Sequence, residues 1–154
     1  MTTSDTPALT IRNPGSRPQV NRKLFVNVPV ENVQRSIDFF EALGFTFDAR
    51  FTAADSTAML VGEDAYFMLL ARKRFGDLVT RPIADPQAAV GATFALGLES
   101  REAVDAMVRK AVELGAVQAH DAEDLGFMYS SGFYDLDGYA WGPFWMDPAA
   151  AQQE

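Results

Sequence analysis

Apolar side chains occupy every second position of residues 23–30, whose sequence is KLFVNVPV. A period of two predicts a β-strand with one aliphatic face, which helices would cover, and it places Phe25 and Asn27 together on the opposite face. Asn27 is a polar residue on an otherwise well-formed strand. It is therefore either a pocket residue or an edge residue with its amide in solvent, and the pattern leaves both open.

The apolar spacing changes to three and four residues after this strand, which predicts a helix. Asn32 is suited to cap its first turn, and Gly44 is suited to end it in a left-handed conformation. Residues 45–52, 56–61 and 65–71 then alternate again and are predicted as strands. The first half of the chain is therefore expected to fold as strand, helix, strand, strand, strand.

The same order is predicted a second time. Residues 93–99 alternate as a strand, and Ser100 is a suitable N-cap for a helix that runs to Leu114 and ends at Gly115. The Leu-Gly pairs that end the two predicted helices occupy matching points of the two halves. An internal repeat of this length predicts two similar modules in tandem.

The second half closes with a predicted hairpin. Residues 116–120 form a short strand and residues 121–125 an acidic turn region. Residues 126–134 and 139–146 are then two strands around Asp137-Gly138, a pair typical of tight β-hairpin turns. If Gly142 faces a pocket, Ala140 and Phe144 share its face, since neighbouring residues of a strand point to opposite sides.

The remaining segments are predicted to lack regular structure. Residues 1–22 and 149–154 are polar tails, and residues 73–91 connect the two modules, 23–72 and 92–148. Loops as long as this connection are usually functional or mobile. Its apolar side chains either form a lid over a pocket or, as we favour, pack against the other half or another subunit. These side chains are Phe75, Leu78, Val79 and Ile83.

Composition excludes several classes of protein. The chain has 154 residues, a net charge of −8 and no cysteine, so disulfides and thiolate metal sites are excluded. An acidic chain without a basic stripe is not expected to bind nucleic acid, and anionic membranes would repel it. No apolar run is long enough for a membrane helix, and the first residues lack a secretory signal. We therefore expect a cytoplasmic protein.

Three stretches resemble the glyoxalase, bleomycin resistance protein and extradiol dioxygenase superfamily, also called vicinal oxygen chelate. They are PVENVQRSIDFFEALGF, SREAVDAMVRKAVELGA, and DLGFMYSSGFYDLDGYAW with the WMDP that follows shortly after it. The resemblance covers about residues 23–148 and is strongest to a glyoxalase-like subgroup. It implies an α+β fold in which two tandem βαβββ modules form a curved mixed-sheet half-barrel pair around a shared pocket. It also implies a homodimer, since many relatives pair modules across subunits, although some relatives pair them within one chain, and the sequence leaves the mode of pairing open.

The resemblance also indicates where metal-dependent members of this family hold their metal, on the first and last strand of each module. Those places map onto Phe25, Met68, Thr93 and Gly142. Divalent metals in this family are held by imidazole and carboxylate groups, which none of these four residues offers. We therefore expect no cofactor, and a divalent metal only if the mapping is displaced. The only histidine, His120, is interpreted as a surface residue rather than as a metal ligand.

The expected function is the binding of a small hydrophobic or aromatic molecule in the pocket between the modules, without a catalytic metal. The residues expected to line it are Phe25, Asn27, Tyr66, Met68, Thr93, Gly142 and Phe144. A metal-dependent lyase similar to lactoylglutathione lyase, or a dioxygenase with unusual ligands, is the alternative. A structural role with a pocket filled by the protein's own side chains is a third possibility. The sequence assigns no catalytic residue and leaves open whether the chain is an enzyme.

Overall fold

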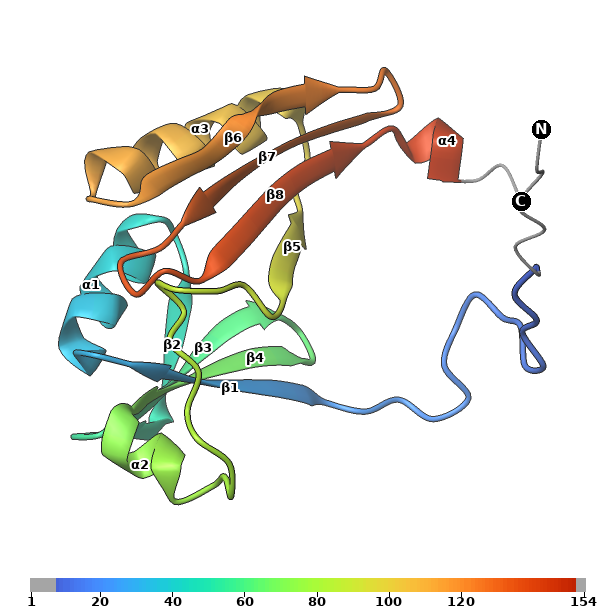
Figure 1. The fold of residues 1–154 in the computed structure, drawn as a ribbon. Coiled ribbons are helices and arrows are strands. Elements are labelled where there is room, and N and C mark those ends of the chain that lie inside the picture. Colours follow the sequence, from blue (N-terminus) through green and yellow to red (C-terminus); the bar gives the residue numbers. More distant parts are fainter. Residues whose placement is uncertain (1–7, 152–154) are drawn as a thin grey trace, which may run out of the picture.

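The computed structural model describes residues 8–151 and contains two mixed sheets of four strands each (Figure 1). The first sheet has the order β1-β4-β3-β2 and consists of β1 (Leu24–Val30), β2 (Thr46–Ala53), β3 (Ser56–Gly62) and β4 (Ala65–Ala71). The second has the order β5-β8-β7-β6 and consists of β5 (Thr93–Gly97), β6 (Val117–Asp124), β7 (Met128–Tyr134) and β8 (Ala140–Met146). Within residues 8–151, β1 pairs in parallel with β4 and β5 in parallel with β8, and the other pairings are antiparallel. This repeated arrangement confirms the predicted α+β fold of two βαβββ modules.

The two main helices, α1 (Val33–Ala42) and α3 (Arg101–Glu113), begin directly after the predicted N-caps and end two residues before the predicted glycines, so α3 is one residue shorter than predicted. The side chains of Asn32 and Ser100 each accept a hydrogen bond of 3.0 Å from the backbone N–H three residues ahead. Gly44 and Gly115 follow the helices with φ angles of 98° and 109°. Residues with a Cβ rarely adopt such angles, so these glycines define where the helices stop.

The helix-bearing sides of both sheets share one aromatic core. Trp141 on β8 lies at its centre, with its ring centroid 4.8 Å from that of Phe67, 5.2 Å from that of Phe94 and 5.3 Å from that of Phe40. These rings come from β4, β5 and α1, so the two modules are joined through their helix-facing sides. The opposite faces of the two sheets consequently point away from the common core.

Three predicted irregular regions contain regular structure. The connection begins with a short helix, α2 (Arg72–Gly76), in which Phe75 is half-buried. The acidic residues 121–124 continue β6 instead of forming a turn, because they pair with β7 as far as Asp124, and Gly126 makes the turn with a φ angle of 83°. The predicted C-terminal tail contains α4 (Pro148–Ala151), which starts where the carboxylate of Asp147 accepts a backbone hydrogen bond.

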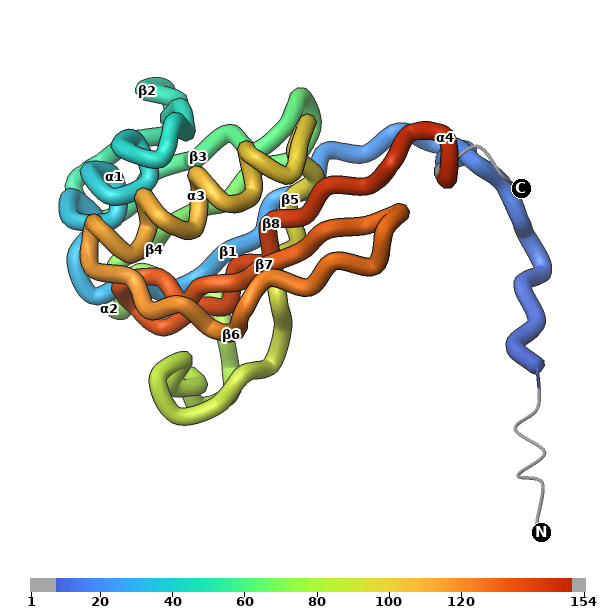
Figure 2. The backbone as a smooth tube through the Cα atoms, turned by 90° about the horizontal axis from the view of Figure 1, so that it is seen from above, coloured from blue at the N-terminus to red at the C-terminus, as the bar shows by residue number. Residues whose placement is uncertain are grey.

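Residues 8–23 contain neither helix nor strand and are exposed, and Figure 2 shows this segment running away from the two modules. The parts of the predicted tails at residues 1–7 and 152–154 lie outside the residues that the structure describes. Between residues 8 and 151, no helix is long and apolar enough to cross a membrane.

Candidate functional site

The predicted pocket residues of the first module lie together on the outer face of the first sheet. Phe67 on β4 is buried in the core, so Tyr66 and Met68 point to the other side. Phe25 pairs with Tyr66 and Asn27 with Met68 in the register of β1 and β4. The rings of Phe25 and Tyr66 are stacked, with centroids 4.6 Å apart and planes within 8°. Phe25 nevertheless remains 41% exposed.

The predicted pocket residues of the second module lie on the outer face of the second sheet. Thr93, Gly142 and Phe144 line one cavity of about 450 Å³ there. Trp141 points to the opposite side, into the core, as strand alternation requires. Within one chain the predicted residues thus form two sets on different sheets, and the structure places both on faces that point outward.

The register also tests the four places where the resemblance locates metal ligands. Met68 pairs with Asn27, two residues after Phe25, and Gly142 pairs with Ala95, two residues after Thr93. In each module, the mapped residue on the last strand thus pairs with the residue two positions after the mapped residue on the first strand. This equivalence is expected of an internal repeat. The four places offer a phenyl ring, a thioether, a hydroxyl and no side chain at all, a donor set that does not fit a divalent metal. Among residues 8–151, no group of three or more His, Asp or Glu side chains is placed to hold a metal ion.

The cavity on the second sheet contains a residue that the sequence did not assign to it. His120 is exposed, as predicted, but it lies on β6 and its ring lines this cavity. A side chain at Gly132 would approach the Nε2 atom of His120 to 2.9 Å, so the ring rests on the glycine. Pairing between His120 and Gly132 in adjacent strands produces this contact. The signal in the sequence is a glycine within an otherwise regular strand, which often marks close approach of another group.

The turn between β7 and β8 sets the position of the site. Oδ1 of Asp135 accepts hydrogen bonds from the backbone N–H groups of Asp137, Gly138 and Tyr139 at 2.9 to 3.0 Å, and Oδ2 accepts one from the indole of Trp141 at 2.8 Å. Burial raises the pKa of Asp135 to about 6, although these hydrogen bonds favour its ionised form. The carboxyl group therefore fixes both the turn and the start of β8.

The same turn also joins the second module to the first. Asp137 is buried and accepts hydrogen bonds from the backbone N–H of Glu31 at 2.9 Å and from the guanidinium of Arg35 at 3.2 Å. The hydroxyl of Tyr139 donates to the backbone carbonyl of Pro29 at 2.7 Å, and burial raises the pKa of this tyrosine. These contacts hold β8, and with it Gly142, in a fixed relation to β1.

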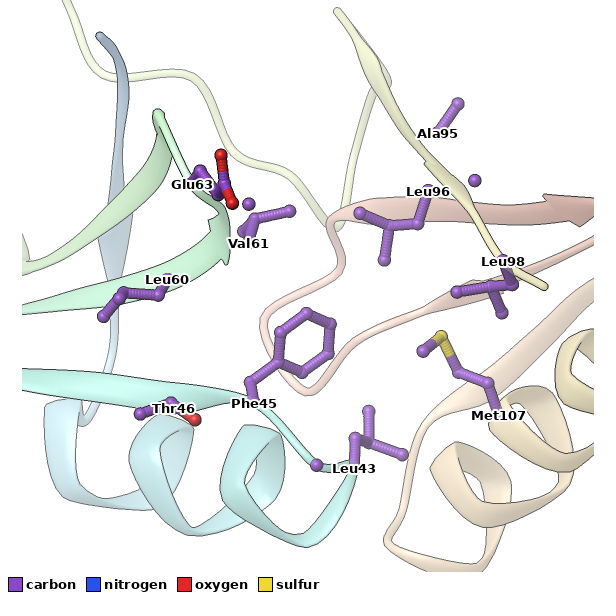
Figure 3. A pocket seen from close by; sticks show the side chains of 13 residues that line it. Leu43, Phe45, Thr46, Leu60, Val61, Glu63, Ala95, Leu96, Leu98 and Met107 are labelled. Atoms are coloured by element: carbon purple, nitrogen blue, oxygen red, sulfur yellow. The ribbon is translucent and has the colours of Figure 1, made fainter.

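Two further cavities lie away from Gly142 and Phe144, and one of them includes a predicted pocket residue, Asn27. A cleft of about 690 Å³ between the modules is lined mainly by apolar side chains, and Figure 3 shows Leu43, Phe45, Leu96 and Met107 converging on it. Among the described residues that line this cleft, Glu63 is the one ionisable side chain, and it is exposed. A smaller cavity of about 260 Å³ lies under the connection between the modules and includes Asn27. Neither cavity brings together polar groups that could perform acid–base chemistry.

Similar structures share the fold at low sequence identity. The hypothetical protein SA1046 from S. aureus is 22% identical with a TM-score of 0.70, over 81% of this chain and 94% of that one. A glyoxalase-related enzyme from Fulvimarina pelagi is 12% identical with a TM-score of 0.69, over 82% and 88%. A glyoxalase/bleomycin resistance protein/dioxygenase family enzyme from Burkholderia phytofirmans PsJN is 12% identical with a TM-score of 0.66, over 79% and 96%. These likenesses establish the fold alone.

Sequence comparison establishes the family. No curated protein sequence matches the chain. The family model described as Glyoxalase/Bleomycin resistance protein/Dioxygenase superfamily matches residues 24–142, which include both modules up to the middle of β8. The chain belongs to the glyoxalase/bleomycin resistance protein/dioxygenase superfamily.

Proposed function

We propose that this protein binds a small, flat, apolar molecule on the outer face of the second sheet, without a catalytic metal. The observation that supports the proposal best is the cavity of about 450 Å³ around Gly142. At this place, where the resemblance puts a metal ligand of metal-dependent relatives, the chain has a residue without a side chain. The lining combines apolar groups such as Phe144 and Met128 with a few hydroxyl groups, a composition typical of small-molecule sites.

The site is proposed to be completed by a second copy of the chain. The stacked rings of Phe25 and Tyr66 form an exposed apolar surface on the outer face of the first sheet. Exposed apolar surfaces of this kind mark interfaces or binding sites. In a homodimer, the first-sheet face of one chain would cover the second-sheet cavity of its partner. That arrangement would bring all seven predicted pocket residues to one site.

Binding is tested by calorimetric titration of chelator-treated protein with a panel of flat apolar compounds. The variant Gly142→Leu should abolish binding, because its side chain fills the cavity while its Cβ meets no atom closer than 3.9 Å. Gly62→Leu is the matched control on the first sheet, where an added Cβ meets no atom closer than 3.8 Å. Binding that requires an added divalent metal, or that survives Gly142→Leu, would refute the proposal.

The dimer is tested by mixing two defective chains. Phe25→Asp places a charge on the exposed first-sheet face, and Gly142→Leu fills the second-sheet cavity. If each site uses one face from each chain, a heterodimer of the two variants contains one intact site and one site with both faces altered. Recovery of binding after mixing supports the shared site. A monomeric mass in solution, or no recovery from a confirmed heterodimer, contradicts it.

A further inference from the structure

The cavity on the second sheet has a flat floor that crosses the strands. Ala95 on β5 pairs with Gly142 on β8, and Gly132 on β7 pairs with His120 on β6. The register of β7 and β8 places Gly132 across from Gly142. One row across four strands therefore consists of a methyl group, two positions without a side chain, and an imidazole at its end. We call this row the slot.

Larger side chains border the slot on both sides. The ring of Phe144 covers Gly97, where an added Cβ would meet it at 3.4 Å, and its strand neighbour is Ser130. Thr93, Ala140 and Tyr134 form the row on the other side. All of these residues except Gly97 line the same cavity. Because the imidazole of His120 already covers Gly132, a flat ring can lie against the backbone at Gly142 and Ala95, whereas a bulky or branched group would meet the side chains of the two rows.

The imidazole at the end of the slot presents an acceptor to it. Nδ1 of His120 lies 2.8 Å from the backbone carbonyl of Asp121, an oxygen that only accepts, so Nδ1 carries the proton in the neutral ring. Nε2 is then an unprotonated acceptor, and it lies directly over Gly132. Within the part of the chain that the structure describes, no protein group donates a hydrogen bond to this nitrogen. A ligand in the slot would therefore best supply a donor.

The charges around the slot favour a neutral donor over an anion. No lysine or arginine contributes to the lining of the cavity as the structure describes it. Asp121 and Glu123 follow His120 on the same strand, and the whole chain carries a net charge of −8. Carboxylates and phosphates would be repelled from this surface, whereas a neutral hydroxyl would not.

We propose that the slot binds a planar aromatic molecule with a hydroxyl group, of the phenol class, whose hydroxyl donates a hydrogen bond to Nε2 of His120. The inference rests on the proposed function, since it names the ligand chemistry of the same cavity. His120 acts here as the residue that selects and orients the ligand.

The test compares two ligands that differ only in the donor, 2-naphthol and 2-methoxynaphthalene, by calorimetric titration. One net hydrogen bond should make the wild-type protein prefer 2-naphthol by about fivefold or more. His120→Phe keeps a flat ring over Gly132 without the nitrogen. This variant should bind both compounds equally, with the affinity for 2-methoxynaphthalene changed by less than about twofold.

The outcomes separate this inference from the proposed function. Equal binding of both compounds by the wild-type protein, abolished by Gly142→Leu, would overturn the role of His120 and leave the proposed cavity supported. A preference for 2-naphthol that persists in His120→Phe would also overturn it, because another group would then be the acceptor. If the wild-type protein binds neither compound but binds other flat apolar molecules, the phenol class alone is refuted. If it binds none, both proposals fail.

Discussion

Replacing Asp135 by asparagine should change how the stability of the protein depends on pH. The folded protein raises the pKa of this buried carboxyl from an ordinary 3.8 to about 6, because burial disfavours the charge more than four hydrogen bonds favour it. At 1.36 kcal/mol for each pKa unit, the difference amounts to about 3 kcal/mol. Wild-type stability should therefore contain a pH-dependent contribution that Asp135→Asn lacks.

The direction of the effect follows from which state binds the proton. Between pH 3.8 and about 6, the folded protein keeps the proton of Asp135 while the unfolded chain releases it. The stabilising contribution of Asp135 is therefore fully present below its unfolded pKa of 3.8 and is lost as the pH rises through its folded pKa of about 6. The free energy of unfolding of the wild type, minus that of Asp135→Asn, should fall by about 2 kcal/mol from pH 4 to pH 8.

Urea unfolding at several pH values, followed by tryptophan fluorescence, measures this difference. The variant also carries a constant cost, because its amide nitrogen faces the indole N–H of Trp141. That cost shifts the difference in unfolding free energy between wild type and variant by the same amount at every pH, so the dependence of this difference on pH is unchanged. Asp55→Asn, at an exposed carboxyl, is the matched control for the substitution itself. If the unfolding free energy of the wild type minus that of Asp135→Asn stays constant or rises from pH 4 to pH 8, the conclusion that burial outweighs the hydrogen bonds in setting the pKa of Asp135 is refuted.

Three other predictions can be checked by the same unfolding measurements. Asn32→Ala and Ser100→Ala should each lower the free energy of unfolding by about 1 kcal/mol, because each removes a helix N-cap, and an unchanged midpoint would contradict this. Asp137→Ala should lower the free energy of unfolding by about 2 kcal/mol, because it leaves donors of the first module without their acceptor. Arg35→Ala, at a side chain that is 43% exposed, should lower it by less than about 1 kcal/mol. Equal losses for the two variants would contradict the conclusion that Asp137 joins the two modules. Phe133→Ala, at a fully buried ring, should cost about 3 to 5 kcal/mol, and a cost below about 1 kcal/mol would mean that the aromatic core is not shared as described.

The fold was predictable because its determinants are local. Alternation, helical spacing, two polar N-caps and two glycines after the helices all lie within short windows of sequence, and each was confirmed. The errors have a different origin. Residues 121–124 are acidic and resemble a turn, but pairing with β7 makes them a strand. Pairing depends on a neighbour in space, and intrinsic strand preference yields to it.

The candidate site was predictable only in part, for the same reason. Strand parity correctly placed Gly142 and Phe144 on one face and Trp141 on the other. The contact between His120 and Gly132 depends on a register that is shifted on both sides of His120. Such irregularities move a side chain relative to its neighbours, and Gly132 in the sequence marks a close approach without indicating which group makes it. The proximity of the histidine to the cavity therefore required the structure.

Strand alternation in β8 separates what stabilises the protein from what shapes the cavity. Trp141 points into the core, where it contacts Phe40 and Phe67 of the first module and Phe94 of the second, and its indole donates to Asp135. Gly142 and Phe144 point outward and contribute to the cavity. Because the core is already filled by the alternate residues, a change at an outward position leaves the packing between the modules intact. The glycine at residue 142 thus leaves the outer face open beside Phe144 while the core packing of β8 is retained.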